Sequence, residues 1–217
     1  MPKQLAIFDL DGTILDTLAD LHQSVNHALS CSGFPLRTLS QVRHDVGNGI
    51  RKLIERSVPE GTPAPAAERV YQDFTSYYAG HCADLTVPYP GVPELLPALR
   101  RAGFRTAVVS NKADYAVRTL CGHFYPGQFD MILGERPDIP KKPAPDPVFR
   151  VLKDLCCSPG DTVYIGDSEV DIETARNAGI PCVSVDWGFR ERSLLTAAGG
   201  APIVSSPEEL FRLLTGL

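Results

Sequence analysis

The fold of this chain is decided by one stretch near its start, Leu5-Ala6-Ile7-Phe8-Asp9-Leu10-Asp11-Gly12-Thr13. The first four of these residues form an apolar run that is typical of a short buried strand. The run ends at Asp9, and a polar loop that contains glycine follows it. The expected strand therefore delivers two carboxylates, those of Asp9 and Asp11, at its C-terminal end.

A long helical segment follows this strand. From about residue 16 to 84, apolar residues recur at helical spacing in successive groups, the first of them at 18–29. The tetrapeptide 17–20 resembles a capping box at the start of this group, and Thr38 with Gln41 suggests a cap for the next. These residues predict a purely helical region.

Beyond this region, strands and helices alternate. Apolar runs predict strands at 106–109, 131–133, 162–165 and 182–185. Such alternation is typical of a parallel α/β sheet. Because the helical segment separates the first strand from the others, we expect an α/β fold: a Rossmann-like open parallel sheet core with an inserted all-helical cap. The expected catalytic core is residues 1–15 and 85–217, and the expected cap is residues 16–84.

The composition is that of a globular protein. Of 217 residues, 43% are hydrophobic and 22% are charged, whereas a disordered chain would hold fewer apolar residues. The length suits one core domain with a modest insertion better than two full domains. The formal net charge of −5 disfavours general binding to nucleic acid or to an anionic membrane surface.

The sequence lacks several segments and motifs. No apolar run approaches the roughly 18 residues that a membrane helix needs, and the first residues lack the core of a signal peptide. The six cysteines form no CxxC pair and the five histidines form no HExxH motif, so zinc catalysis is not expected. Free thiols are the default in a reducing compartment, and we expect a cytoplasmic protein with no nucleic-acid or membrane partner.

Polar residues gather where the expected strands end. The clusters are Asp9-Leu10-Asp11-Gly12-Thr13, Ser110-Asn111, Lys142, and Gly166-Asp167-Ser168 with Asp171. In open α/β sheets, ligands bind outside the carboxyl ends of the strands. We therefore expect these four clusters to converge on one site.

The residue types in these clusters suit phosphate chemistry. Asp9, Asp11 and Asp167 would form a site rich in oxygen ligands, which a hard cation such as Mg²⁺ prefers. Lys142 and Ser110 offer a positive charge and a hydroxyl to phosphoryl oxygens. A phosphate monoester carries about −2 charge, and a divalent cation with a lysine offsets its repulsion by a carboxylate. The residues favour metal-assisted phosphoryl transfer to a carboxylate nucleophile.

Four motifs resemble those of the haloacid dehalogenase superfamily, and they occur in its order along nearly the whole chain. The motifs are Phe8-Asp9-Leu10-Asp11-Gly12-Thr13-Ile14-Leu15-Asp16-Thr17, Ser110 after Val108-Val109, Lys142-Pro143-Ala144-Pro145-Asp146-Pro147, and Gly166-Asp167-Ser168-Glu169-Val170-Asp171. Each motif alone is a weak signal, whereas four in order are highly specific. The helical insertion after the first motif resembles the cap of the phosphoglycolate phosphatase-like branch.

The resemblance implies a role for each of these residues. Asp9 would be the nucleophile that becomes an aspartyl phosphate, and Asp11 would protonate the leaving oxygen and then deprotonate the attacking water. Asp9, the main-chain carbonyl of Asp11 and Asp167 would hold Mg²⁺. Ser110 and Lys142 would grip the transferring phosphoryl group, although Ser110 could also serve as a helix N-cap.

Further residues are expected around these. Asp171 would orient Lys142 or a metal-bound water, and Thr13 and Asn111 are expected to bind substrate. Two neighbouring lysines compete for one role, and Lys142 is favoured over Lys141 because it directly precedes the prolines of the motif. Those prolines restrict the backbone that carries the lysine.

Two loops are open to more than one interpretation. Gly47-Asn48-Gly49 with Arg51 is either a specificity loop lowered onto the substrate or a plain turn with a solvated arginine. The branch that the chain resembles has such a loop there, so Gly47, Asn48 and Arg51 are expected to bind substrate. The segment Trp187-Gly188-Phe189-Arg190 either lines the site or merely turns the chain.

The acid at position 11 favours a phosphatase over a dehalogenase, because a halide leaving group needs no proton. We expect a Mg²⁺-dependent phosphatase for a small phosphomonoester, with phosphoglycolate as the best single substrate. Pyrophosphate, a sugar phosphate, a nucleoside monophosphate and a phosphoglucomutase-like isomerase stay open; a phosphonate hydrolase and a noncatalytic binding module are less favoured. The expected partner is a small phosphorylated metabolite, and the protein would be a monomer or a homodimer.

Overall fold

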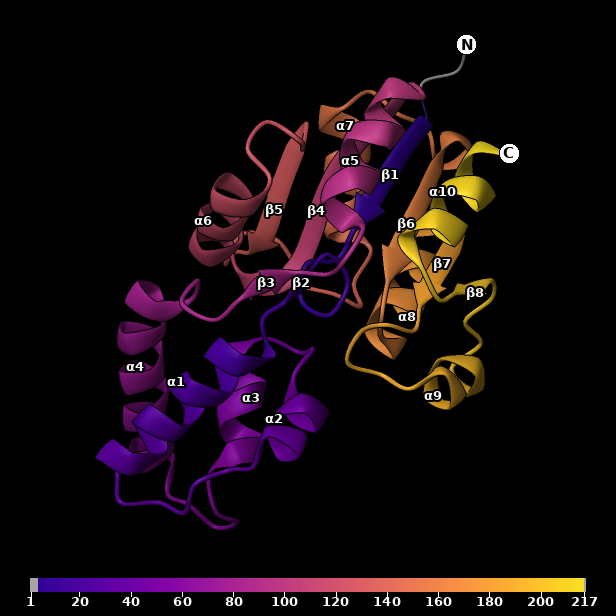
Figure 1. Ribbon diagram of the computed structural model, residues 1–217. Coiled ribbons are helices and arrows are strands. Elements are labelled where there is room, and N and C mark those ends of the chain that lie inside the picture. The colour runs from indigo at the N-terminus through magenta and orange to yellow at the C-terminus, as the bar shows by residue number, and fades with distance from the viewer. Residues whose placement is uncertain (1–3, 217) are drawn as a thin grey trace. The chain divides into compact units, whose positions relative to one another are not determined.

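The structure is a computed structural model, and it describes residues 4–216. The chain divides into two compact units, Met1–Leu15 with Pro88–Leu217 and Asp16–Val87. The elements of both units are labelled in Figure 1. The chain leaves the larger unit at β2 (Leu15–Asp16) and returns to it at β3 (Val87–Pro88), and these two short strands pair with each other.

The larger unit is built on a six-stranded sheet. In sheet order, the strands are β5 (Met131–Glu135), β4 (Phe104–Ala113), β1 (Gln4–Phe8), β6 (Thr162–Gly166), β7 (Cys182–Val185) and β8 (Ile203–Val204). Every neighbouring pair is parallel, and β1 lies in the interior of the sheet between β4 and β6 (Figure 1). Strands buried on both faces are continuous apolar runs, which explains the apolar runs in the sequence.

The register of the sheet brings the ends of its central strands level. Phe8 pairs with Val108 on one side and with Ile165 on the other. Asp9 comes directly after Phe8, and its backbone N–H still donates to the carbonyl oxygen of Ile165, at 2.9 Å. Asp167 lies two residues beyond Ile165, so the pairing of β1 with β6 brings two carboxylates to the same edge of the sheet.

Helices pack against the sheet of the larger unit. They are α5 (Val92–Arg101), α6 (Asp114–Phe124), α7 (Asp146–Asp154), α8 (Glu169–Ala178), α9 (Arg192–Ala197) and α10 (Pro207–Thr215), with a 3-10 turn at Pro159–Asp161. Leu5 and Ile7 of β1 cluster with Val151 of α7 and Ala175 of α8, so these two helices share one face of the sheet. Figure 1 shows α5 and α10 in front of the sheet, where they contact each other.

The smaller unit is helical. It contains α1 (Leu18–Cys31), α2 (Leu39–Asp45), α3 (Ile50–Ser57) and α4 (Ala64–His81). Fully buried side chains of α1 and α4 form its centre, namely Val25, Leu29, Val70, Phe74 and Tyr78. Each such side chain stabilises the fold by about 1.5–3 kcal/mol when it leaves water. The parallel sheet and this helical cap confirm the predicted fold class.

Two local predictions in the helical unit have different outcomes. The capping box at α2 is confirmed, since Thr38 accepts a hydrogen bond from Gln41 and the Gln41 side chain accepts one from the Thr38 N–H. The capping box expected at 17–20 is wrong. Thr17 is the N-cap of α1, but its side chain makes no hydrogen bond that caps the helix.

The carboxylate of Asp20 has a different partner. It accepts hydrogen bonds from the backbone N–H groups of Leu85 and Thr86, at 2.9 and 2.8 Å, and from the Thr86 hydroxyl at 2.7 Å. A fully buried acidic group needs such donors, and these lie at the other end of the unit. This tertiary contact outweighs the local cap and ties the first turn of α1 to the segment before β3.

Other elements differ from the sequence-based expectation. The strand expected at 106–109 extends from Phe104 to Ala113, while α9 and β8 are short elements that no apolar pattern indicated. Because Ser110 lies inside β4 and α6 begins only at Asp114, the alternative role of Ser110 as a helix N-cap is wrong. Within residues 4–216, every helix is too short or too polar to cross a membrane.

Candidate active site

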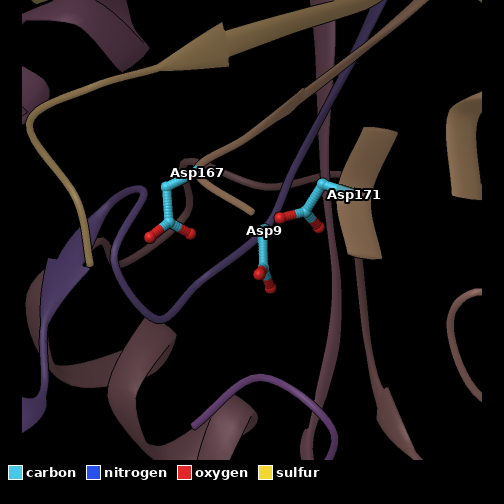
Figure 2. Close-up of side chains that lie close together, drawn as sticks. All are labelled: Asp9, Asp167 and Asp171. Carbon is cyan, nitrogen blue, oxygen red and sulfur yellow. The ribbon is translucent and has the colours of Figure 1, made fainter. Parts of the chain in front are cut away.

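Three buried carboxylates form the centre of the candidate site. Ligand oxygens of Asp9, Asp167 and Asp171 all lie within 4.8 Å of one another. Figure 2 shows the three side chains grouped where β1 and β6 end. Because like charges at this distance repel in a buried setting, the cluster needs positive charge to stay ionised.

The pKa values of two of these acids reflect that need. Burial raises the pKa of Asp9 to about 7; the charge of Lys142 opposes the rise, whereas those of Asp171 and Asp11 add to it. Burial also raises the pKa of Asp167 well above its ordinary value, and the charges of Asp171 and Asp9 act in the same direction. Both acids hold a proton more tightly than they would in water.

Lys142 supplies a positive charge to this cluster. Its Nζ lies 3.0 Å from Oδ1 of Asp9, 2.8 Å from Oδ1 of Asp171 and 3.1 Å from the hydroxyl of Tyr164. Burial alone would lower the pKa of Lys142, but the adjacent charges of Asp171 and Asp9 raise it well above its ordinary value. The neighbouring Lys141 instead pairs with Glu135 at 3.2 Å. The structure thus places Lys142, and not Lys141, beside Asp9.

The backbone that carries Lys142 is fixed by two amide side chains. Asn111 donates from Nδ2 to the carbonyl oxygen of Lys142 at 3.0 Å, and Asn177 donates to that of Pro143 at 2.8 Å. Asn111 was expected to bind substrate, and this contact gives it a part in holding the lysine. Its expected contact with substrate stays a prediction.

Asp171 uses both carboxylate oxygens within the protein. Oδ1 accepts from Lys142, and Oδ2 accepts from the backbone N–H and the hydroxyl of Ser168, at 3.1 and 2.6 Å. The side chain approaches the backbone of Gly166 so closely that a Cβ there would lie 2.3 Å from Cγ of Asp171. The absence of a side chain at Gly166 therefore leaves the space that the Asp171 side chain occupies. The contacts of Asp171 agree with its expected role in orienting Lys142.

The segment 187–189 lies against the first motif and Asp167, which the sequence left open. Trp187 donates from Nε1 to the carbonyl oxygen of Thr13 at 3.0 Å, and the backbone N–H of Phe189 donates to Oδ2 of Asp167 at 2.7 Å. A Cβ at Gly188 would lie 2.2 Å from the carbonyl oxygen of Gly12. The segment 187–189 therefore contacts both the first motif and Asp167.

Two more residues complete the surroundings of Asp167. The Thr13 hydroxyl lies 3.4 Å from Oδ1 of Asp167. Arg190 pairs with Glu169 at 3.1 Å, and its charge lowers the pKa of Asp167 in opposition to burial. Thr13 is thus placed beside the acidic cluster, while its expected contact with substrate stays a prediction.

Lys112 is a residue of the site that the sequence analysis missed. Its Nζ lies 2.8 Å from Oδ1 of Asp11, and only 2% of its side chain is exposed. Its backbone N–H donates to the hydroxyl of Ser110 at 3.3 Å. The available signal was its position two residues after Ser110, because alternate residues of a strand point to the same face.

The residues expected to bind substrate in the helical unit lie in one loop and the helix after it. Gly47 has a φ of 123° and lies between α2 and α3. Arg51 pairs with Glu68 at 2.8 Å and lies over the ring of Tyr71, with 4.2 Å between the guanidinium carbon and the ring centroid. Substrate binding by Gly47, Asn48 and Arg51 stays a prediction.

The acidic cluster fits a divalent cation. It offers oxygen ligands only, which suit hard cations such as Mg²⁺. Burial, with a smaller contribution from the neighbouring acids, raises the pKa values of Asp9 and Asp167, and a bound cation would stabilise their ionised forms. The carboxylate of Asp11 is not a member of this cluster and faces Lys112. Binding of the cation by the main-chain carbonyl of Asp11 stays a prediction.

The chain belongs to the haloacid dehalogenase-like hydrolases. The family matches residues 6–185, a range that includes all four motifs and every buried acid of the cluster. The predicted family is therefore confirmed.

Two curated relatives of similar identity are named as phosphatases. The phosphoglycolate phosphatase of Pseudomonas syringae pv. tomato is 33% identical over 222 residues, which cover 100% of this chain and 80% of that protein. The N-acetylmuramic acid 6-phosphate phosphatase of Pseudomonas aeruginosa is 31% identical, with 99% of this chain and 96% of that protein covered. A crystal structure from Lactobacillus delbrueckii subsp. bulgaricus superposes with a TM-score of 0.94 at 37% identity, and covers both chains fully.

Proposed function

We propose that this protein is a Mg²⁺-dependent phosphatase that hydrolyses a small phosphomonoester through an aspartyl phosphate on Asp9. The observation that carries the proposal is the contact of Lys142 with both Asp9 and Asp171 beside the buried Asp167. A lysine held against a carboxylate at the end of a parallel strand suits attack by that carboxylate on a phosphorus atom.

The two acids of the first motif divide the chemistry. In the first step, an oxygen of Asp9 bonds to phosphorus while the ester P–O bond breaks, and Asp11 gives its proton to the departing oxygen. In the second step, water bonds to phosphorus and the bond to Asp9 breaks, while Asp11 takes the proton of the water. Asp9 is thereby regenerated, and the proton returns to Asp11.

The remaining residues manage charge. Lys142 and Ser110 would bind phosphoryl oxygens, and Asp171 would keep Lys142 in place. Asp9, Asp167 and the main-chain carbonyl of Asp11 would hold Mg²⁺. When bound, Mg²⁺ would polarise the phosphoryl group and offset the repulsion between phosphate and carboxylates.

Phosphoglycolate is the substrate that we propose first, because several relatives of similar identity carry the name phosphoglycolate phosphatase. A relative of nearly equal identity is named for N-acetylmuramic acid 6-phosphate, so sugar phosphates belong in the same test. We further propose a cytoplasmic location, which agrees with the six free cysteines. A monomer or a homodimer is proposed for its assembly.

The experiment is a screen of phosphorylated metabolites with the purified chain and Mg²⁺, with release of inorganic phosphate as the readout. We expect phosphate release that requires Mg²⁺ and that is lost in Asp9→Asn. Trapping of radiolabelled phosphate on the protein, followed by identification of the labelled residue, tests the intermediate. Label on any residue other than Asp9, or full activity of Asp9→Asn, would overturn the proposal.

A further inference from the structure

Among the buried charged side chains that the structure describes at the candidate site, Lys112 has no task in the proposed chemistry. Lys112 is as buried as Lys142, with 2% of each side chain exposed. The two lysines contact different acids, since Lys142 binds Asp9 and Asp171 whereas Lys112 binds Asp11. A buried ammonium costs free energy unless it is paired, so a lysine at 112 calls for a reason.

The backbone of Lys112 in β4 packs closely against the neighbouring strand β5. A Cβ at Gly134 of β5 would lie 2.7 Å from the carbonyl oxygen of Lys112, so the two strands approach each other closely at this point. The pairing of β4 with β5 shifts register between Val109 and Ala113, which includes Lys112. Such irregularities re-aim side chains at functional sites. The backbone of Lys112 is thus fixed while its side chain extends to Asp11.

The two members of the ion pair differ in exposure. The Asp11 side chain is 15% exposed, against 2% for Lys112. A substrate would therefore meet the carboxylate and not the ammonium group. The greater exposure of Asp11 therefore favours a role in which Lys112 acts on the substrate indirectly, through the Asp11 carboxyl group, over direct binding of the substrate by Lys112.

We propose that Lys112 is a positioning residue that holds the carboxyl group of Asp11 for proton transfer. This inference rests on the proposed phosphatase function. Lys112 binds Oδ1 of Asp11 and so fixes the rotation of the carboxyl group. In this proposal Oδ2 is the oxygen that carries the proton. The proton moves from Oδ2 to the departing oxygen in the first step and from water to Oδ2 in the second.

This role has a signature that a merely structural lysine would lack. An alkyl phosphate needs Asp11 in both steps, whereas 4-nitrophenyl phosphate has a leaving group that departs without a proton. In Lys112→Met, turnover of an alkyl phosphate should fall by about a hundredfold, as expected for a misplaced catalytic group. With 4-nitrophenyl phosphate, the first step should survive and the second should become slow.

The experiment compares wild type, Lys112→Met and Lys153→Met in Mg²⁺, where Lys153 is an exposed lysine of α7 that serves as a matched control. For Lys112→Met, we expect a rapid burst of about one nitrophenolate per protein molecule, then slow steady release, as for an accumulating covalent intermediate. Lys153→Met should match wild type. Two results for Lys112→Met would overturn the role of Lys112. One is a nitrophenolate burst that falls by the same factor as the turnover of the alkyl phosphate. The other is a burst and an alkyl phosphate turnover that both equal those of wild type.

The double variant Asp11→Asn/Lys112→Met also tests whether Lys112 acts through Asp11. Because position 11 is then a neutral amide, loss of Lys112 leaves no unpaired carboxylate that could destabilise the fold. If Lys112 acts through Asp11, its replacement should change the rate of Asp11→Asn by less than about twofold. A further loss near a hundredfold would show that Lys112 acts independently of Asp11. If the wild-type protein releases no phosphate, or if Asp9→Asn releases phosphate, the proposed function is wrong. If wild type is active, Asp9→Asn is inactive and Lys112→Met behaves like wild type, the proposed function stands and the inference on Lys112 is wrong.

Discussion

The hydroxyl of Tyr164 lies 3.1 Å from Nζ of Lys142 and donates a hydrogen bond to the carbonyl oxygen of Val109 at 3.0 Å. Tyr164 belongs to β6 and is fully buried, so it supports the lysine from the interior of the sheet. One phenol thereby satisfies a buried carbonyl of β4 and orients the ammonium group that faces Asp9.

Tyr164→Phe should destabilise the protein by about 1–3 kcal/mol, because the Val109 carbonyl loses its buried donor. It should also lower kcat/KM, since Lys142 keeps Asp9 and Asp171 but loses its third acceptor. Chemical denaturation and steady-state kinetics measure the two effects. Tyr125→Phe is the matched control: Tyr125 donates to the Ile14 carbonyl and does not contact Lys142, so its loss should affect stability more than kcat/KM. Equal kinetic losses in both variants would contradict a specific role for Tyr164.

Binding of Mg²⁺ should release protons below neutral pH. The pKa of Asp9 in the metal-free protein is raised to about 7, mainly by burial, so Asp9 is protonated below that pH and must lose its proton to bind a cation. The apparent Mg²⁺ affinity should therefore fall about tenfold for each pH unit below about 7 for every proton released. Calorimetry in buffers of different ionisation enthalpy counts these protons. An affinity that does not change with pH in this range would contradict the raised pKa.

Asp9→Asn should stabilise the metal-free protein while it abolishes turnover. An acid whose folded-state pKa lies above its unfolded value weakens the folded state as pH rises from the unfolded pKa to the folded one. For Asp9 this window runs from 3.8 to about 7. At neutral pH the neutral amide should therefore raise the free energy of unfolding, by about 4 kcal/mol at most.

Denaturation of Asp9→Asn and wild type at two pH values tests this sign. At about pH 3, below both the unfolded pKa of 3.8 and the folded pKa of about 7, Asp9 is mostly protonated in both states and the two proteins should differ little. Near pH 7 the variant should be the more stable. A variant that is less stable at both pH values would contradict the argument.

The sequence predicts which residues follow the strands, and the parallel register then brings Asp9 and Asp167 together. That convergence is a consequence of chain order and strand pairing, so it needs no knowledge of side-chain packing. The partners of Tyr164 and Lys112 could not be predicted in this way. Lys112 meets an acid that is 101 positions away in the sequence, and nothing local specifies the distance between them.

Tertiary contacts also override local signals. The four residues at 17–20 have the pattern of a capping box, yet Asp20 bonds to residues 65 and 66 positions further along the chain. The segment 187–189 carried no charge pattern that pointed to Asp167, because its contact is made by a backbone N–H and by the absence of a side chain at Gly188. Such contacts depend on the backbone path and leave little trace in the residue types.

Gly188→Ala should weaken both Mg²⁺ binding and turnover. The new Cβ would lie 2.2 Å from the carbonyl oxygen of Gly12 and 2.5 Å from Oδ2 of Asp167, so the loop must move away from the acidic cluster. We expect at least about a tenfold loss of turnover and a destabilisation of about 1–3 kcal/mol from overpacking. Gly160→Ala is the control, because its nearest neighbour to a new Cβ lies at 3.8 Å. Mg²⁺ titrations that give the same affinity for Gly188→Ala and wild type would contradict the expected displacement of Asp167.

Asp20→Ala should destabilise the helical unit without touching the acidic cluster. The carboxylate accepts hydrogen bonds from two backbone N–H groups and one hydroxyl, all at Leu85 and Thr86. A hydrogen bond to a charged group contributes about 1.5–3 kcal/mol, and the buried donors left behind add a desolvation cost, so a total loss of about 2–4 kcal/mol is expected. Asp20→Asn should recover only part of the lost stability, because an amide offers one acceptor oxygen and turns two donors toward other donors.

Glu60→Ala, at an exposed position of the same unit, is the control and should change stability by less than about 0.5 kcal/mol. Hydrogen exchange at the amides of residues 85 and 86 locates the effect: their protection should fall in both Asp20 variants, and protection equal to that of wild type would show that these amides do not depend on Asp20.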